Sequence, residues 1–236
     1  VFLLGFLPAV LFIIAGAQKS GTTSLYAYLG EHPSVQTPAI KDVSFFDNHF
    51  QRGVAWYRSH FPLAPQRTAD DGMIEATQTC ESTASYLFHL HAVRRIASLL
   101  QEVKIILLLR NPVDRAFSHY QLNLRRGNEE LSFAEALAAE ERRLSGEERR
   151  MLMDESYASF AHEKHSYLAR GRYAEQIERW QQYFPPERLL ILDAETLFRE
   201  PAATFASTLR FLGLPSRTPE RFGNRFPGRY RARMSS

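Results

Sequence analysis

The sequence of 236 residues contains only one cysteine, Cys80, so no disulfide bond can form within the chain. Internal repeats and low-complexity linkers are also missing. The fold must therefore be stable through packing alone, and a reducing compartment would suit it. Because 44% of the residues are hydrophobic, a chain of this length can bury roughly 70% of its unfolded surface in one core. This excludes a disordered protein and a small disulfide-stapled one.

The chain also lacks a large excess of charge of one sign. Lys and Arg number 29 against 26 Asp and Glu, which gives a formal net charge of +3. That excess is too small to indicate nucleic-acid binding, so we expect no nucleic-acid partner. A slightly basic chain does suit an anionic cofactor or substrate.

The first 17 residues have no charged side chain, and the first ionisable one is Lys19. A membrane-spanning helix needs about 20 apolar residues, whereas Pro8 divides this run. The second half, Val10–Ala15, is a β-branched and aromatic block followed by Gly16. Such a block predicts a buried parallel strand rather than a membrane helix or a signal peptide. We therefore expect no membrane association and a cytoplasmic protein.

Short continuous apolar runs alternate with segments of helical periodicity along the whole chain. This alternation predicts an α/β fold with a central parallel sheet flanked by helices. The expected strands are Leu11–Ala15, Met73–Ala76, Ile105–Leu109 and Leu189–Leu192. The expected helices are Thr22–Gly30, Ala92–Leu100, Val113–Arg126, Phe133–Leu144, Tyr173–Tyr183 and Ala202–Leu212.

The connection between the first strand and the first helix carries the strongest local signal. Residues 16–25 read Gly-Ala-Gln-Lys-Ser-Gly-Thr-Thr-Ser-Leu. A glycine-bearing turn at a helix N-terminus points backbone N–H groups at an anion and therefore favours phosphate. Gly16 and Gly21 have the spacing of the phosphate-binding loop of nucleoside triphosphatases. Thr22, however, stands where that loop has its lysine, and the lysine lies three positions earlier, at Lys19.

With this displaced lysine, residues 16–25 resemble the 5′-phosphosulfate loop of sulfotransferases that use 3′-phosphoadenosine 5′-phosphosulfate (PAPS). Residues 105–120 are similar to the 3′-phosphate segment of the same family, in which a strand ends in arginine and a serine follows eight positions later, here Arg110 and Ser118. Residues 45–57, 171–185, 189–197 and 211–214 look most like the heparan sulfate N- and 3-O-sulfotransferase branch. The similarity extends over about residues 11–215.

The resemblance implies a P-loop-like three-layer α/β fold and in-line transfer of a sulfuryl group from PAPS to a hydroxyl or amine. The acceptor is expected to be a carbohydrate or another small molecule, and no metal ion is required. Lys19 would neutralise the bridging oxygen of the leaving nucleotide, because one lysine can stabilise the modest charge that develops there. Arg110 and Ser118 would hold the 3′-phosphate. The donors to the 5′-phosphate would be Ser20, Gly21, Thr22, Thr23 and Ser24.

A general base must deprotonate the acceptor. In the glycan branch the resemblance implies a carboxylate shortly before a Phe-Phe pair, and Asp42 occupies that place, although the family residue is usually Glu. Asp47, directly after the pair, is the alternative. Lys41 is either a contact for the cofactor or acceptor or a plain surface lysine. Heparan enzymes often carry an assisting lysine at the position of Ser82, which can replace only its hydrogen bond.

The C-terminal residues are basic, with no acidic residue after Glu220. Within the family, a late Gly-Arg segment closes over the 3′-phosphate, and Gly228–Arg231, with Arg229 as the contact, could stand in for it. Family members generally continue through one more helix. We therefore expect a single domain over residues 1–236 that is truncated at its C-terminus.

Two other functions remain open at this stage. One is an ATP-dependent kinase, since Leu189–Asp193 imitates the apolar run ending in Asp that binds magnesium. The other is an inactive glycan-binding relative. Histidines at 89, 91, 162 and 165 have metal-like spacing but no completing ligands, so we assign them no metal. His119 is expected to line the nucleotide pocket. Tyr86 is either packed in the core, which we favour, or part of the acceptor cleft.

Overall fold

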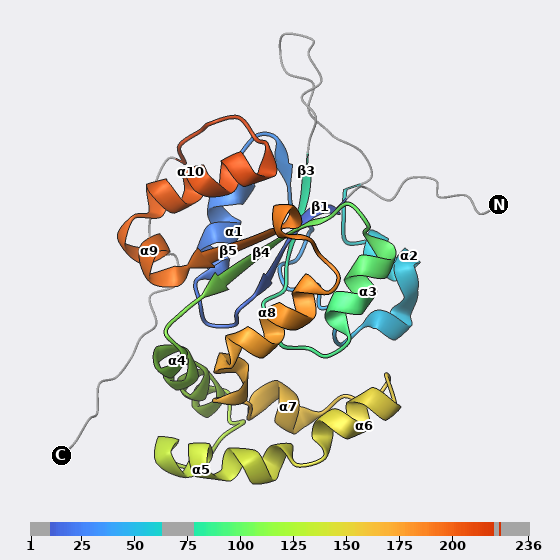
Figure 1. The fold of residues 1–236 in the computed structure, drawn as a ribbon, viewed down its shortest axis with the longest axis vertical. Helices are drawn as coiled ribbons and strands as arrows, with labels where there is room; N and C mark the ends of the chain where they lie inside the picture. The colour runs from blue at the N-terminus through green and yellow to red at the C-terminus, as the bar shows by residue number, and fades with distance from the viewer. Residues whose placement is uncertain (1–9, 63–77, 220–221, 223–236) are drawn as a thin grey trace.

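The computed structural model describes residues 10–62, 78–219 and 222. Figure 1 shows a parallel sheet with helices on both of its faces. The five strands follow the spatial order β2-β3-β1-β4-β5, so β1 lies in the centre. Their bounds are β1 Val10–Gly16, β2 Val35–Gln36, β3 Gln78–Ser82, β4 Lys104–Leu109 and β5 Leu189–Asp193. This confirms the P-loop-like three-layer α/β fold with a central parallel sheet.

The helices follow the strands in the alternating order that such a sheet requires. The first group is α1 Thr22–Gly30, α2 Gly53–Arg58, α3 Ala92–Leu99, α4 Pro112–Arg125 and α5 Phe133–Leu144. The second group is α6 Glu147–Met153, α7 Phe160–Lys164, α8 Tyr173–Gln181, α9 Ala194–Arg199 and α10 Pro201–Leu212. Short 3₁₀ turns occupy Phe50–Arg52, Ala169–Gly171 and Pro186–Arg188. No helix in the described part of the chain is long and apolar enough to cross a membrane.

The side chains of β1 and β4 alternate between two hydrophobic cores, because successive residues of a strand point to opposite faces. Ile13 and Ile105 belong to the core that includes residues of α3 and α8. Ile14 and Ile106 belong to the core that includes residues of α1 and α10. All four side chains are fully buried. Coverage on both faces explains why these strands are continuous apolar runs.

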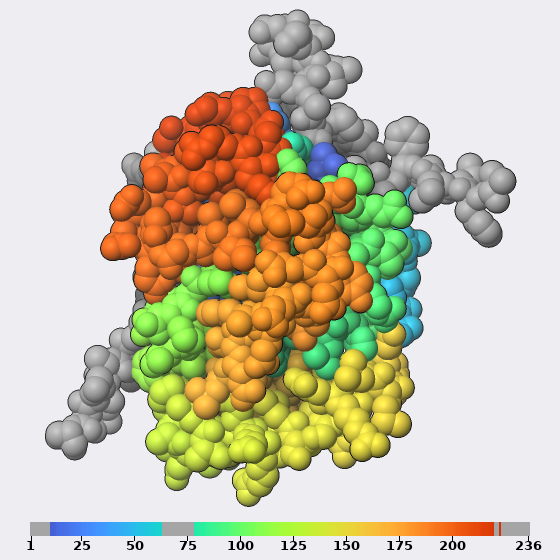
Figure 2. All heavy atoms as spheres, viewed as in Figure 1, coloured from blue at the N-terminus to red at the C-terminus, as the bar shows by residue number. Residues whose placement is uncertain are grey.

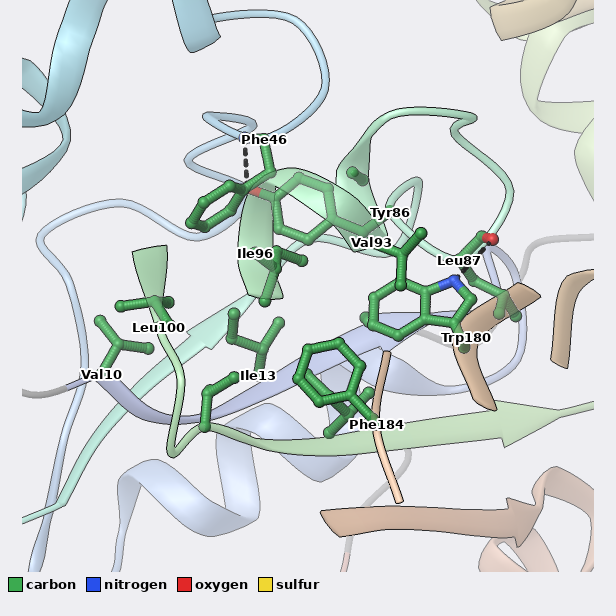
Figure 3. Packing of buried hydrophobic residues seen from close by; sticks show 14 of the residues in the cluster. Val10, Ile13, Phe46, Tyr86, Leu87, Val93, Ile96, Leu100, Trp180 and Phe184 are labelled. Atoms are coloured by element: carbon green, nitrogen blue, oxygen red, sulfur yellow. Dashed lines mark hydrogen bonds between the residues drawn. The ribbon is translucent and has the colours of Figure 1, made fainter. Parts of the chain in front are cut away.

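Helix α8 closes the first of these cores. Trp180 is fully buried, and its indole N–H donates to the carbonyl of Leu87 over 3.1 Å. The ring of Phe184 stacks on it with the centroids 5.8 Å apart. Figure 3 shows the Trp180 ring beside Val93 and the Phe184 ring beside Ile13. In Figure 2, the atoms of α8 and of the segment after it cover the middle of this face.

Helices α4 to α7 gather at the end of the molecule toward which β4 points (Figure 1). They have a small core of their own, made by Ala116 and Tyr120 of α4, Ala136 of α5 and Tyr167. Helix α5 begins with a capping box, in which Ser132 and Glu135 each bond the other's backbone N–H. These four helices form a small subdomain that lies beyond the carboxyl end of β4.

The expected strands at β1, β4 and β5 and the six expected helices are present, with ends that differ by at most two residues. The expected strand Met73–Ala76 lies outside the described residues. Strands β2 and β3 were not predicted. The reason is physical, because β2 has only two residues and β3 reads Gln-Thr-Cys-Glu-Ser, which offers no apolar run.

Candidate functional site

A cleft of about 670 Å³ opens where residues that follow β1, β3 and β4 come together. Open parallel sheets bind ligands at this edge, beyond the carboxyl ends of their strands. Most of the site residues expected from the sequence line this cleft: Lys19, Gly21, Thr22, Thr23, Ser24, Asp42, Arg110 and Ser118. Arg229 lies outside the described residues. The structure thus brings together segments that are up to about a hundred residues apart.

The loop after β1 is anchored at its start and its end. The N–H of Ala17 donates to the carbonyl of Leu108 on β4 over 2.7 Å, and the N–H of Ser20 donates back to Ala17 over 3.2 Å. Lys19 has a left-handed backbone with φ 71°, a conformation that costs energy for a residue with a side chain. The loop therefore holds Lys19 in a fixed, strained turn at the edge of the cleft.

Glycine is required at Gly21, which precedes the first residue of α1. Its φ is 89°, and a Cβ atom there would lie 2.8 Å from Cε1 of Phe198. As the N-cap, it has no side chain that could bond the first N–H groups of α1. These donors and the positive end of the helix face the cleft, which is the arrangement that binds phosphate.

Ser20 differs from its neighbours in the loop, because it is fully buried and does not line the cleft. Its hydroxyl lies beside the phenol of Tyr173. That phenol donates to the carbonyl of Arg110 over 3.0 Å. Ser20 thus lies under the loop, and a bond from its hydroxyl to a phosphate stays a prediction.

Arg110 lies beside the loop, directly after the end of β4. Its Nη1 donates to the carbonyl of Lys19 over 3.3 Å, and its Nε lies 3.7 Å from a carboxylate oxygen of Glu195. The next residue, Asn111, caps α4 by accepting from the N–H groups of Val113 and Asp114. The cap fixes the direction of α4, which places Ser118 in the same cleft.

Of the two candidate bases, only Asp42 lines the cleft. Its carboxylate is about half exposed, and Oδ1 accepts from Nζ of Lys41, also a cleft residue, over 2.8 Å. Asp47 is buried and lines a smaller neighbouring pocket instead. There it accepts from the Ser85 hydroxyl over 2.5 Å, and burial raises the pKa of its carboxyl.

Ser82 and His119 do not line the cleft. The Ser82 side chain is fully buried in β3. His119 is also buried, its ring meets the ring of Tyr167 edge-on at 5.1 Å, and burial holds its pKa well below 6.5. The expectation that His119 lines the nucleotide pocket is therefore wrong, because this side of α4 faces the subdomain core.

Two of the histidines with metal-like spacing, His89 and His162, lie in surroundings that lower the pKa of their rings. His162 stacks on Phe88 with the centroids 4.3 Å apart, and burial lowers its pKa to about 2. Burial likewise lowers the pKa of His89 to about 3. Across residues 10–62 and 78–219, no group of three or more His, Cys, Asp or Glu side chains could hold a metal ion.

Sequence reasoning missed two features of the site. Arg126, Lys164 and Arg170 also line the cleft, although they come from three separate segments. The second feature is Glu81, which is fully buried behind the cleft wall and accepts hydrogen bonds from Tyr57 and Tyr86. A charged residue between two buried neighbours in β3 is the one local signal that could have indicated it.

Comparison with known proteins gives a consistent result. The family model described as the sulfotransferase domain matches residues 11–224. The chain is 37% identical over 214 residues to the human bifunctional heparan sulfate N-deacetylase/N-sulfotransferase 3. It is 33% identical over 213 residues to the mouse bifunctional heparan sulfate N-deacetylase/N-sulfotransferase 1. Each match covers 86% of this chain and 22% of the relative, so the chain spans about a fifth of the length of these proteins.

Among solved structures, the chain is similar to a sulfotransferase from Alicyclobacillus acidocaldarius. The TM-score is 0.69 and the sequences are 30% identical, with 89% of this chain and 83% of that one covered. A mouse sulfotransferase complexed with PAP shares the fold at a TM-score of 0.52 and 16% identity, with 90% of this chain and 60% of that one covered.

Proposed function

Because the chain belongs to the sulfotransferase family, whose members use PAPS, we propose that it transfers a sulfuryl group from PAPS to a carbohydrate hydroxyl or amine. One observation carries this proposal. A single cleft is lined by Lys19 of the anion-binding loop, by Arg110 and Ser118 beyond β4, and by the Asp42 carboxylate. These are the groups needed to bind both ends of the nucleotide and to take a proton from an acceptor.

The loop and Arg110 form the nucleotide half of the cleft. Sulfuryl transfer depends mainly on positioning and on stabilising the charge that develops on the leaving oxygen. The N–H groups at the start of α1 would bind the 5′-phosphate, and Lys19 would neutralise the bridging oxygen. Arg110 would give the 3′-phosphate a planar pair of donors, with the Ser118 hydroxyl as a further donor. The bond from Arg110 to the Lys19 carbonyl already joins these two contacts.

Asp42 is the proposed base. Its half-exposed carboxylate can reach an acceptor that enters from solvent, and the Lys41 ammonium fixes one of its oxygens. The other oxygen can take the proton of the acceptor as the acceptor attacks sulfur. The sulfuryl group then moves to the acceptor oxygen or nitrogen, and 3′-phosphoadenosine 5′-phosphate (PAP) leaves with the bridging oxygen.

The acceptor half of the cleft supports a carbohydrate that carries anionic groups. From the cleft lining we assign Arg126, Lys164 and Arg170 to this half, together with Asp42 and Glu163, the two acidic residues of the lining. Glu163 forms an ion pair with Lys164. Cations in a partly enclosed cleft attract carboxylate or sulfate groups. The named activity of the similar human and mouse proteins on heparan sulfate agrees with such an acceptor.

The kinase alternative rested on Asp193 at the end of β5. In the structure, the Asp193 carboxylate caps α9, since it accepts from the N–H and the hydroxyl of Thr196, each over 2.7 Å. It does not line the cleft. No observation on the described residues therefore favours the kinase.

Calorimetric titration with PAP, and separately with ATP and Mg²⁺, tests the nucleotide half. We expect metal-independent PAP binding that Lys19→Ala and Arg110→Ala each weaken by about tenfold or more, as for a charge-assisted bond. Arg188→Ala is the matched control. Arg188 pairs with Glu102, and both residues precede the amino ends of β4 and β5, at the edge of the sheet away from the cleft. A preference for Mg-ATP, or equal effects of all three substitutions, would contradict the proposal.

Transfer from labelled PAPS tests the acceptor half. We expect transfer to N-desulfated heparin oligosaccharides, which carry carboxylates, and much less to uncharged chitin oligosaccharides. Asp42→Asn should abolish transfer and leave PAP binding unchanged. Glycan binding without any transfer would favour the inactive relative instead.

A further inference from the structure

The loop that carries the proposed base has an unusual backbone. We call residues 42–46 the base loop. Asp42 and Ser44 both have left-handed backbones, with φ 58° and 54°. A left-handed backbone is unfavourable for a residue with a side chain, so the surrounding structure must impose the conformation. The contacts that impose this backbone conformation therefore also fix the position of the Asp42 carboxylate.

Backbone N–H groups hold the base loop to the segment after β3. The N–H of Asp42 donates to the carbonyl of Ser82 over 3.0 Å. The other bonds run to side-chain hydroxyls. The N–H of Ser44 donates to the Thr83 hydroxyl over 3.2 Å. The N–H groups of Phe45 and Phe46 both donate to the Tyr86 hydroxyl, over 2.9 and 3.3 Å. Figure 3 shows the bond that joins Phe46 to Tyr86.

A hydroxyl can accept these bonds freely only if its own proton points elsewhere. The Tyr86 and Thr83 hydroxyls both donate their proton to the carboxylate of Glu81. Its Oε1 accepts from Tyr86 over 2.5 Å and from Thr83 over 3.1 Å. Its Oε2 accepts from Tyr57 over 2.5 Å. Since each hydroxyl has one proton, donation to Glu81 leaves the oxygen lone pairs for the base loop.

We propose that Glu81 and Tyr86 are positioning residues for sulfuryl transfer: Glu81 orients the Tyr86 and Thr83 hydroxyls, and these hold the base loop so that Asp42 faces the acceptor. This inference rests on the proposed function. Neither Glu81 nor Tyr86 lines the cleft, and both are fully buried, so neither touches substrate. They act through the base loop alone.

The chain offers a matched pair of substitutions. Tyr57 and Tyr86 are both buried tyrosines that donate to Glu81 over 2.5 Å. Only Tyr86 also accepts N–H groups from the base loop; the hydroxyl bond of Tyr57 goes to Oε2 of Glu81. Tyr86→Phe and Tyr57→Phe therefore each remove one hydrogen bond to Glu81 and keep an aromatic ring. Only Tyr86→Phe also removes the acceptor of the Phe45 and Phe46 N–H groups.

Kinetics with PAPS and N-desulfated heparin oligosaccharides test the positioning role. We expect Tyr86→Phe to lower kcat by about tenfold or more, because small misplacement of a reacting group is costly. Its Kd for PAP should change less than about twofold, as the nucleotide half is untouched. Tyr57→Phe should leave both values close to those of the wild type. Equal losses of kcat in the two variants would indicate a structural role only and overturn the proposal.

Amide hydrogen exchange of residues 45 and 46, whose N–H groups donate to Tyr86, gives a readout that needs no acceptor. Exchange there should be at least about tenfold faster in Tyr86→Phe than in Tyr57→Phe. If the wild type transfers no sulfuryl group, the proposed function fails, while this exchange difference still decides whether the hydroxyls hold the loop. Equal exchange in both variants would overturn the inference even if transfer occurs.

Glu81→Gln provides the conservative variant. The amide oxygen can take the place of Oε1 and keep Tyr86 and Thr83 as donors, while the amide NH₂ faces Tyr57, whose oxygen can accept. We expect kcat within about threefold of the wild type. Glu81→Ala should lower kcat as Tyr86→Phe does, and a Glu81→Gln variant as slow as Glu81→Ala would contradict the orienting role.

Discussion

Glu81 also makes a quantitative prediction about stability and pH. Its carboxyl is fully buried, and burial raises its pKa from the usual 4.5 to about 7. The three hydroxyl donors, from Tyr57, Tyr86 and Thr83, lower the pKa, but burial outweighs them. The perturbation is Glu81→Gln, which keeps the size and removes the titration.

The sign follows from proton binding. Between pH 4.5 and about 7 the folded protein holds a proton on Glu81 that the unfolded chain has already released. The free energy of unfolding therefore falls as the pH rises through this window, and the contribution is fully present only below pH 4.5. A gap from 4.5 to about 7, at roughly 1.4 kcal/mol for each pH unit, gives about 3 kcal/mol in all. Between pH 5 and pH 7.5 the change is roughly 2 kcal/mol.

Urea unfolding of the wild type and of Glu81→Gln at pH 5 and pH 7.5 measures this contribution. Other titrating groups are shared, so they cancel in the difference between the two proteins. We expect the wild type to lose roughly 2 kcal/mol more than the variant over this interval. Tyr57→Phe keeps the carboxyl and removes a donor that lowers its pKa, so its loss of stability over this interval should be at least as large as that of the wild type. Parallel pH profiles of wild type and Glu81→Gln would refute the argument that burial shifts this group.

Two further predictions concern the loop and the sheet. Gly21→Ala should weaken PAP binding by about tenfold or more in calorimetry, because its Cβ would lie 2.8 Å from Phe198 at φ 89°; Gly127→Ala, at φ 70° with no atom within 4 Å, should leave binding unchanged. Ile106→Val, in the fully buried centre of β4, should lower the free energy of unfolding by about 1 kcal/mol in urea titration. Ile191→Val on β5, where the side chain is 41% exposed, should cost less than half of that, and the reverse order would contradict the core assignment.

The loop after β1 and the end of β4 could be predicted because their residues are local in sequence. Lys19 lies in one continuous loop between a strand and a helix, and Arg110 directly ends an apolar strand. Each pattern depends on neighbouring residues only. The same holds for β1 and β4, whose burial on both faces leaves a continuous apolar run.

The basic residues that we propose to face the acceptor could not be predicted in the same way. Arg126, Lys164 and Arg170 meet only because α4, α7 and the turn after α7 pack together. Strand β3 is polar, since Glu81 bonds side chains of other segments instead of contributing to an apolar run. Such residues are recognised by their tertiary partners, which a single sequence does not contain.

The strand order has an evolutionary consequence. From the central β1, the chain first builds β2 and β3 on one side and then β4 and β5 on the other. Lys41 and Asp42 come from the first side, whereas Arg110 and Ser118 come from the second. Under the proposed function, the base and the residues that hold the 3′-phosphate thus come from opposite sides of β1. Under the same proposal, substitutions within residues 37–48 can alter how the base meets an acceptor without altering Lys19, Arg110 or Ser118.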